Sequence, residues 1–196
     1  MYERILNNFA IDITLNDAER AFLLDRLELK EYKKKDKILL AGTVAKELNF
    51  VADGCLRIYH VDETGKEHSV SFFPEGWWAT DLESFYAKTP SFYAIDALED
   101  SKIFALGHNK IEELYNRSPR FERFFRILTQ KGYIIYQRRM TSALYRSAET
   151  RYRNFQDLFP SLENRISKKL IASYLGITPE FLSLLRKNAR SKKEKG

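Results

Sequence analysis

The spacing of apolar residues changes character twice along the chain. Residues 16–30 place apolar side chains at positions that suit a short amphipathic helix; these are Ala21, Phe22, Leu23, Leu24 and Leu27. Six short runs rich in β-branched and aromatic residues follow, namely KILLAG, ELNFVADG, CLRIYHV, EHSVSFFPEG, SFYAIDAL and KIFAL. Because Gly, Asp or Pro stands at the breaks, their spacing predicts an antiparallel barrel or sandwich.

A hairpin and two helices are expected next to these strands. Residues 62–66 form a predicted turn because Gly65 can adopt the positive φ of a tight reversal. Residues 109–147 show mostly helical spacing, which predicts a short helix, a break at Ser118-Pro119 and a second helix of nearly 30 residues. A helix of that length favours dimerisation, and the alternative is that its aromatic stripe packs only on its own barrel.

The stretch ISKKLIASYLGITPEFLSLLRKNAR has the pattern of two helices that cross at a tight turn. Ser167 can cap the first helix, and Gly176 can end it in the left-handed conformation. Thr178-Pro179 then provides a hydroxyl cap followed by proline at the first helical position. The pattern predicts a helix-turn-helix over residues 167–188.

Charge supports a nucleic-acid partner for this end of the chain. Lys131–Gly196 carry 15 Lys or Arg against 5 Asp or Glu, which leaves 18 against 22 for residues 1–130 out of totals of 33 and 27. Basic segments bind nucleic acids because neutralised phosphates release counterions, and the alternative is a solvated tail. The candidate DNA contacts are Ser167, Lys168, Lys169, Thr178, Glu180, Phe181, Ser183, Leu184, Arg186 and Lys187. Arg190, Lys192, Lys193 and Lys195 are expected to add phosphate contacts.

Composition indicates a cytoplasmic globular protein. With 196 residues, of which 44% are hydrophobic, the chain has material for one or two packed cores. Neither a run of about 20 apolar residues nor a basic-then-apolar leader occurs, so we expect no membrane association. Cys55 is the single cysteine, which excludes an internal disulfide and a cysteine-bound cluster; we expect no cofactor.

In the order of these parts, the chain resembles the cyclic-AMP-receptor/FNR (Crp/Fnr) family of bacterial transcription regulators along nearly its full length. The resemblance implies an α+β fold with an antiparallel β-barrel of the double-stranded β-helix or jelly-roll type at 1–117. A long dimerisation helix at 118–147 and an all-α helix-turn-helix domain at 148–196 would follow. It also implies a homodimer that binds a palindromic operator in double-stranded DNA, with RNA polymerase as a further partner.

The ligand pocket departs from the cyclic-nucleotide-binding relatives. Their phosphate cassette has a Gly-Glu pair and a later Arg-Ser-Ala, whereas Thr80-Asp81 and Phe92-Tyr93-Ala94 stand at those places here. The phosphate-binding arginine is therefore missing, and Asp81 and Glu83 would repel a cyclic phosphate. We predict no response to cyclic AMP. An unknown effector in a pocket of Trp78, Asp81, Glu83, Phe92 and Tyr93 is one interpretation of this region, and a filled core is the other.

The recognition helix also differs from the pattern of the Crp/Fnr relatives, because those that read guanine often carry arginine where this chain has Pro179 and Leu184. The competing interpretation of the whole chain is a cupin-like barrel that binds a metal or a small molecule. Only His60, His68 and His108 are available as imidazole ligands, and no nucleophile, phosphate-loop or dinucleotide motif occurs, so we do not expect an enzyme. A third interpretation is a degenerate regulator without tight DNA binding.

Overall fold

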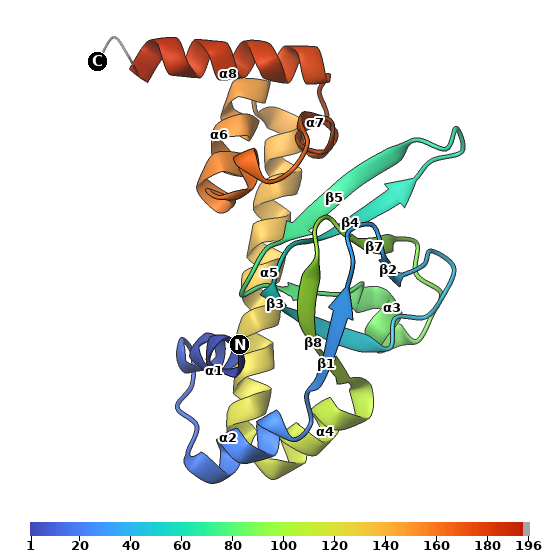
Figure 1. Ribbon diagram of the computed structural model, residues 1–196, viewed down its shortest axis with the longest axis vertical. Coiled ribbons are helices and arrows are strands. Elements are labelled where there is room, and N and C mark those ends of the chain that lie inside the picture. Colours follow the sequence, from blue (N-terminus) through green and yellow to red (C-terminus); the bar gives the residue numbers. More distant parts are fainter. Residues whose placement is uncertain (194–196) are drawn as a thin grey trace.

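The computed structural model describes the backbone of residues 1–193 and the side chains of residues 1–188. A β-rich part and a small helical part lie at different heights along one long helix, as Figure 1 shows. The basic side chains expected at Arg190, Lys192, Lys193 and Lys195 lie outside the described residues.

The β-rich part consists of two antiparallel sheets of four strands each. The first has the order β1 (Glu28–Tyr32), β8 (Ser101–Gly107), β3 (Glu47–Asp53) and β6 (Trp78–Ala79). The second has the order β2 (Lys37–Leu39), β7 (Ala94–Ala97), β4 (Leu56–Val61) and β5 (Glu67–Phe73). The sheets enclose a core that includes Phe50, Phe104 and Ile95, all fully buried. The strands do not pair into one continuous ring, so the predicted barrel is two facing sheets and is not closed.

The six predicted strand runs correspond to β2, β3, β4, β5, β7 and β8. Two strands were missed for a physical reason: β1 reads ELKEY, which is largely charged and exposed, and β6 has only two residues. The predicted hairpin is confirmed, since β4 pairs with β5 and Gly65 has a φ of 81°.

Four short helices accompany the sheets: α1 (Tyr2–Ala10), α2 (Asp17–Leu24), α3 (Leu82–Ala87) and α4 (His108–Arg117). The prediction of a helix across residues 16–30 is wrong in its second half, because α2 ends at Leu24 and residues 28–32 join β8 as strand β1. Helix α1 was not among the predicted elements. Its Phe9 stacks on Phe124 of the long helix at 3.8 Å between ring centroids.

The long helix α5 (Pro119–Tyr145) has 27 residues and begins at the predicted break, where the Ser118 hydroxyl accepts a hydrogen bond from the Arg120 amide. Its first turns are buried against the sheets and α1 through three phenylalanines, Phe121, Phe124 and Phe125. Its second half exposes large apolar side chains instead, namely Tyr133, Ile134, Tyr136, Met140, Leu144 and Tyr145. The two halves of α5 therefore face different surroundings.

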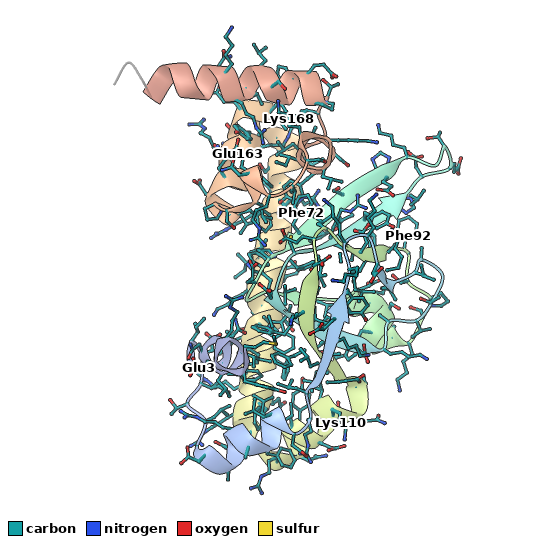
Figure 2. The ribbon with its side chains drawn as sticks, in the orientation of Figure 1. Glu3, Phe72, Phe92, Lys110, Glu163 and Lys168 are labelled. Atoms are coloured by element: carbon teal, nitrogen blue, oxygen red, sulfur yellow. The ribbon has the colours of Figure 1, made fainter. Side chains whose placement is uncertain are left out.

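The C-terminal part contains α6 (Ala148–Leu158), a 3-10 turn η1 (Leu162–Asn164), α7 (Lys168–Leu175) and α8 (Pro179–Lys193). It packs on the β-rich part through Phe72 of β5, which lies 5.4 to 6.3 Å from the rings of Phe155, Phe159 and Tyr174. Phe72 is labelled in Figure 2 where the two parts meet. One buried aromatic cluster thus joins the two parts.

Candidate nucleic-acid interface

The turn between α7 and α8 is built as the sequence predicts. The Ser167 hydroxyl accepts a hydrogen bond from the Leu170 amide at the start of α7. Gly176 ends α7 with a φ of 66°, and the Thr178 hydroxyl accepts a hydrogen bond from the Phe181 amide at 3.2 Å. These local bonds satisfy helix-end groups, so α7 and α8 are held at a defined crossing.

One side of α8 packs inward and the other faces solvent. Leu182 and Leu185 are buried in the core of the helical unit together with Ile171 of α7. On the other side, Phe181 and Leu184 keep 43% and 50% of their surface exposed. The other exposed positions on this side are Glu180, Lys187 and Asn188. Figure 1 shows α8 lying across the end of the molecule, away from the sheets.

Asn188 was not among the predicted contacts, although its position four residues after Leu184 places it on the same helix face. An asparagine amide can pair with both hydrogen-bonding groups of adenine in the major groove. The helical spacing from Leu184 is the sequence signal that indicates this position.

Two of the residues predicted to contact DNA form interactions within the protein instead. The Arg186 side chain is only 16% exposed; its Nε lies 2.9 Å from Oε1 of Glu163, and its Nη2 donates to the Glu163 carbonyl. Arg186 therefore links α8 to η1, contrary to the expectation that it lies on the exposed side. The Ser183 hydroxyl donates to the Pro179 carbonyl at 3.0 Å, which binds it to its own helix.

The remaining predicted contacts lie at the start of α7, where Ser167, Lys168 and Lys169 are exposed. Figure 2 labels Lys168 at the same end of the molecule as α8. The first backbone amides of a helix carry partial positive charge, and two lysines beside them increase the attraction for an anion. This combination suits a phosphate of a nucleic-acid backbone.

The five residues predicted as an effector pocket have different surroundings in the structure. Trp78 belongs to the core, with its ring 5.2 Å from Phe50 and 5.6 Å from Phe125 and its Nε1 donating to Asn8. Phe92 is 62% exposed and stacks on the His60 ring at 3.9 Å. For Trp78, the filled-core interpretation agrees with the structure.

Asp81 and Tyr93 do lie close together, and Ser91 joins them. The buried Asp81 carboxylate accepts hydrogen bonds from the Ser91 hydroxyl at 2.7 Å and from the amides of Glu83 and Ser84. The Ser91 hydroxyl in turn accepts from the Tyr93 amide. Glu83 itself is exposed. A buried, hydrogen-bonded carboxylate thus occupies the stretch where the relatives' cassette begins.

Residues 29–118 match the family model of the cyclic nucleotide-binding domain. The two sheets, α3 and α4 lie almost entirely within this stretch. A search of curated proteins found no match. Comparison with solved structures extends the likeness to as much as 91% of the chain. The chain has the Crp/Fnr fold.

Three solved structures illustrate the Crp/Fnr fold. FixK2 from Bradyrhizobium japonicum superposes with a TM-score of 0.72 at 18% identity, over 85% of this chain and 86% of that chain. The c-di-GMP responsive global regulator CLP from Xanthomonas campestris gives a TM-score of 0.70 at 15% identity, over 91% and 93%. The catabolite activator protein of Thermus thermophilus gives 0.55 at 19% identity, over 91% and 85%. At these identities the likeness shows the fold.

The described residues contain neither a metal-binding cluster nor a helix suited to cross a membrane. Within the described residues there is no cluster of three or more His, Cys, Asp or Glu side chains arranged to hold a metal ion. His60 and His68 are cross-strand partners, but His60 stacks on Phe92 and His68 lies 2.6 Å from Asp62. Over residues 1–193, none of the helices combines the length and apolar character required to cross a bilayer.

Proposed function

We propose that the protein is a sequence-specific DNA-binding transcription regulator of the Crp/Fnr type that acts in the cytoplasm. The observation that carries this proposal is the solvent-facing side of α8, which the capped turn and the buried leucines hold at a fixed angle to α7. A helix presented in this way fits the major groove of DNA. Glu180, Leu184, Lys187 and Asn188 would face base edges, while Lys168 and Lys169 would meet phosphates.

The protein acts as a homodimer joined along the second half of α5. Tyr133, Gln137, Met140 and Leu144 recur at intervals of four, three and four residues, which is the spacing of a coiled-coil seam. Tyr133 and Leu144 are 65% and 68% exposed, so this stripe has no apolar partner within the described part of the chain. A second copy of the same helix would cover it, and the two α8 helices would then read a palindromic operator.

Cyclic AMP does not regulate the protein. Its phosphate would meet the buried Asp81 carboxylate at the start of the cassette, and no arginine stands at Phe92 or Tyr93. Burial of a phosphate beside a carboxylate without a cationic partner is unfavourable. Isothermal titration with cyclic AMP should therefore show no binding at micromolar concentrations, and saturable binding in that range would contradict this part of the proposal.

The experiment that tests DNA binding selects sequences from random and genomic fragments with the purified protein. We expect a palindrome, and we expect Lys187→Ala and Asn188→Ala to weaken its binding. Loss of a base-edge contact costs about 1–3 kcal/mol and relaxes the preference at one position. Lys168→Ala should reduce the salt dependence of binding by about one phosphate contact per subunit, with little change in sequence preference.

Lys46→Ala is the matched control, because Lys46 is exposed on the β-rich part. It should leave both affinity and salt dependence unchanged. Weak binding without sequence preference would refute the proposed regulator and favour a degenerate member of the fold. Analytical ultracentrifugation of wild type and Leu144→Glu tests the dimer: the wild type should sediment as a dimer and the variant as a monomer.

A further inference from the structure

A cleft of about 1050 Å³ lies where α5, β5, α6 and α7 meet. Its walls include Ser69 and Val70 of β5, residues 135–143 of α5, and Tyr174 of α7. The cleft therefore touches the β-rich part, the long helix and the first helix of the helix-turn-helix. None of the five residues predicted as an effector pocket belongs to its lining.

Arg139 projects from α5 into this junction. Its Nη2 donates to the carbonyls of Ser69 and Tyr174 at 3.3 and 3.2 Å, and its guanidinium carbon lies 4.2 Å from the centre of the Tyr174 ring. Among the described residues, no carboxylate lies within ion-pair distance of Arg139, and both of its hydrogen bonds come from Nη2, which leaves Nε and Nη1 without a partner in this part of the chain. Burial lowers the pKa of Arg139, and the nearby Tyr174, Tyr136 and Tyr93 offset this only in part.

Two other enclosed arginines among the described residues are neutralised by carboxylates. Arg57, with a side chain only 4% exposed, pairs with Asp96 and Glu67. Arg165 pairs with Glu75 and Glu99. Arg139 and Arg151 depart from this pattern, because the described side chains offer neither of them a carboxylate partner, and a partly buried charge without a counterion is unfavourable.

The charged side chains that line the cleft are mostly basic. Arg138, Arg146 and Arg151 line it together with Arg139, and Asp157 is the one acidic residue of the lining. Arg151 donates to the carbonyls of Leu175 and Arg146, so its hydrogen bonds also leave its charge uncompensated. A concave site lined by several cations attracts an anion, and the planar guanidinium fork matches a carboxylate or a phosphate.

We propose that this cleft binds a small organic anion whose carboxylate or phosphate group pairs with Arg139, with Arg146 and Arg151 completing the cationic wall. The aromatic faces of Tyr136 and Tyr174, both in the lining, would pack against the body of the ligand. The site lies beside the stretch Ser173–Gly176, which ends α7 immediately before the recognition helix. Occupancy would therefore stabilise one orientation of the helix-turn-helix on the β-rich part.

Anion binding itself can be measured without DNA. The full-length protein is titrated with citrate, pyrophosphate and inorganic phosphate at constant ionic strength, with chloride as the reference salt. We expect saturable binding of citrate or pyrophosphate and a rise in Tm on addition of the same anion. Citrate alone would identify a carboxylate ligand, and pyrophosphate with phosphate would identify a phosphorylated one.

Three variants assign the binding to the cleft. Arg139→Gln should lower the affinity by about tenfold or more and abolish the rise in Tm, since it removes the charge-assisted bond. Arg153→Gln is the matched control, because Arg153 is exposed on α6 but absent from the lining; its titration should equal that of wild type. Arg146→Gln, at the exposed rim, should lower the affinity severalfold and provides the test if Arg139→Gln does not fold.

The absence of saturable binding with all three anions up to millimolar concentration would overturn the proposal, as would equal affinities for wild type, Arg139→Gln and Arg146→Gln. Only the regulatory consequence rests on the proposed function. DNA binding by the anion-free protein tests that function separately, so the two proposals fail independently. An anion-dependent change in operator affinity that Arg139→Gln removes would establish the regulatory role.

Discussion

The aromatic contact between the β-rich part and the helical part should make a large contribution to stability. Phe72 belongs to β5, yet its ring is fully buried against Phe155, Phe159 and Tyr174 of the C-terminal helices. Truncation of a buried phenylalanine to alanine costs about 3–5 kcal/mol, because apolar contacts are lost and a cavity remains. We expect a loss in this range for Phe72→Ala.

Urea unfolding followed by two probes measures this effect. Far-UV circular dichroism reports all helices, whereas tryptophan fluorescence includes Trp77, whose ring lies 5.3 Å from Phe159 at the same interface. In Phe72→Ala the fluorescence transition should move to lower urea than in wild type, and part of the helical signal should be lost with it. The shift reflects weaker attachment of the helical part.

The matched control is Phe92→Ala, which removes the same side chain from a position that is 62% exposed. Its cost should stay within about 1 kcal/mol, as for most exposed positions. A loss of less than about 1 kcal/mol in the free energy of unfolding of Phe72→Ala would refute the reasoning, because removal of a fully buried ring should cost more than that.

Three further changes test single features of the structure. Gly176→Ala should cost about 1–2 kcal/mol in thermal unfolding, because the φ of 66° disfavours a side chain although no atom lies within 4 Å of the added Cβ; an unchanged Tm would contradict the left-handed helix end. Burial raises the pKa of the Cys55 thiol to about 12, so a thiol reagent at pH 8 should label it only after unfolding, and rapid labelling of the native protein would contradict its burial. Burial alone would raise the pKa of Glu75, but the hydrogen bonds and charge of Arg165 outweigh it and lower the pKa. The stabilisation from Glu75 is thus complete above its unfolded pKa and is lost as pH falls through the lower folded value; Glu75→Gln should flatten the acid side of the stability profile, and an unchanged profile would count against this ion pair.

Much of the fold was predictable because the signals are local. Strand patterning, the Gly65 turn and the Ser118-Pro119 break each depend on a few neighbouring residues, and the structure contains all of them. The prediction was wrong for residues 28–30 for a tertiary reason. These largely charged residues directly follow the apolar helical pattern that ends at Leu27, but pairing with β8 draws them into a strand.

In the candidate site, too, some features are encoded by neighbouring residues and others depend on tertiary contacts. The caps at Ser167 and Thr178 are encoded in the residues that form them, so the helix-turn-helix was visible in the sequence. The role of Arg186 was not, since its partner Glu163 lies 23 residues earlier in the chain. The sequence alone does not distinguish a basic residue that is free to bind DNA from one that forms an ion pair within the protein.

By itself, the sequence determined most of the strands, the long helix and the capped turn between α7 and α8, because caps, turns and hydrophobic periodicity act over a few residues. Only the tertiary structure decided which charges are neutralised. Arg57 and Arg165 meet carboxylates, while Arg139 meets only carbonyls and an aromatic ring. The physical reason is that electrostatic energy depends on distance and burial in space, and the order of residues along the chain specifies neither.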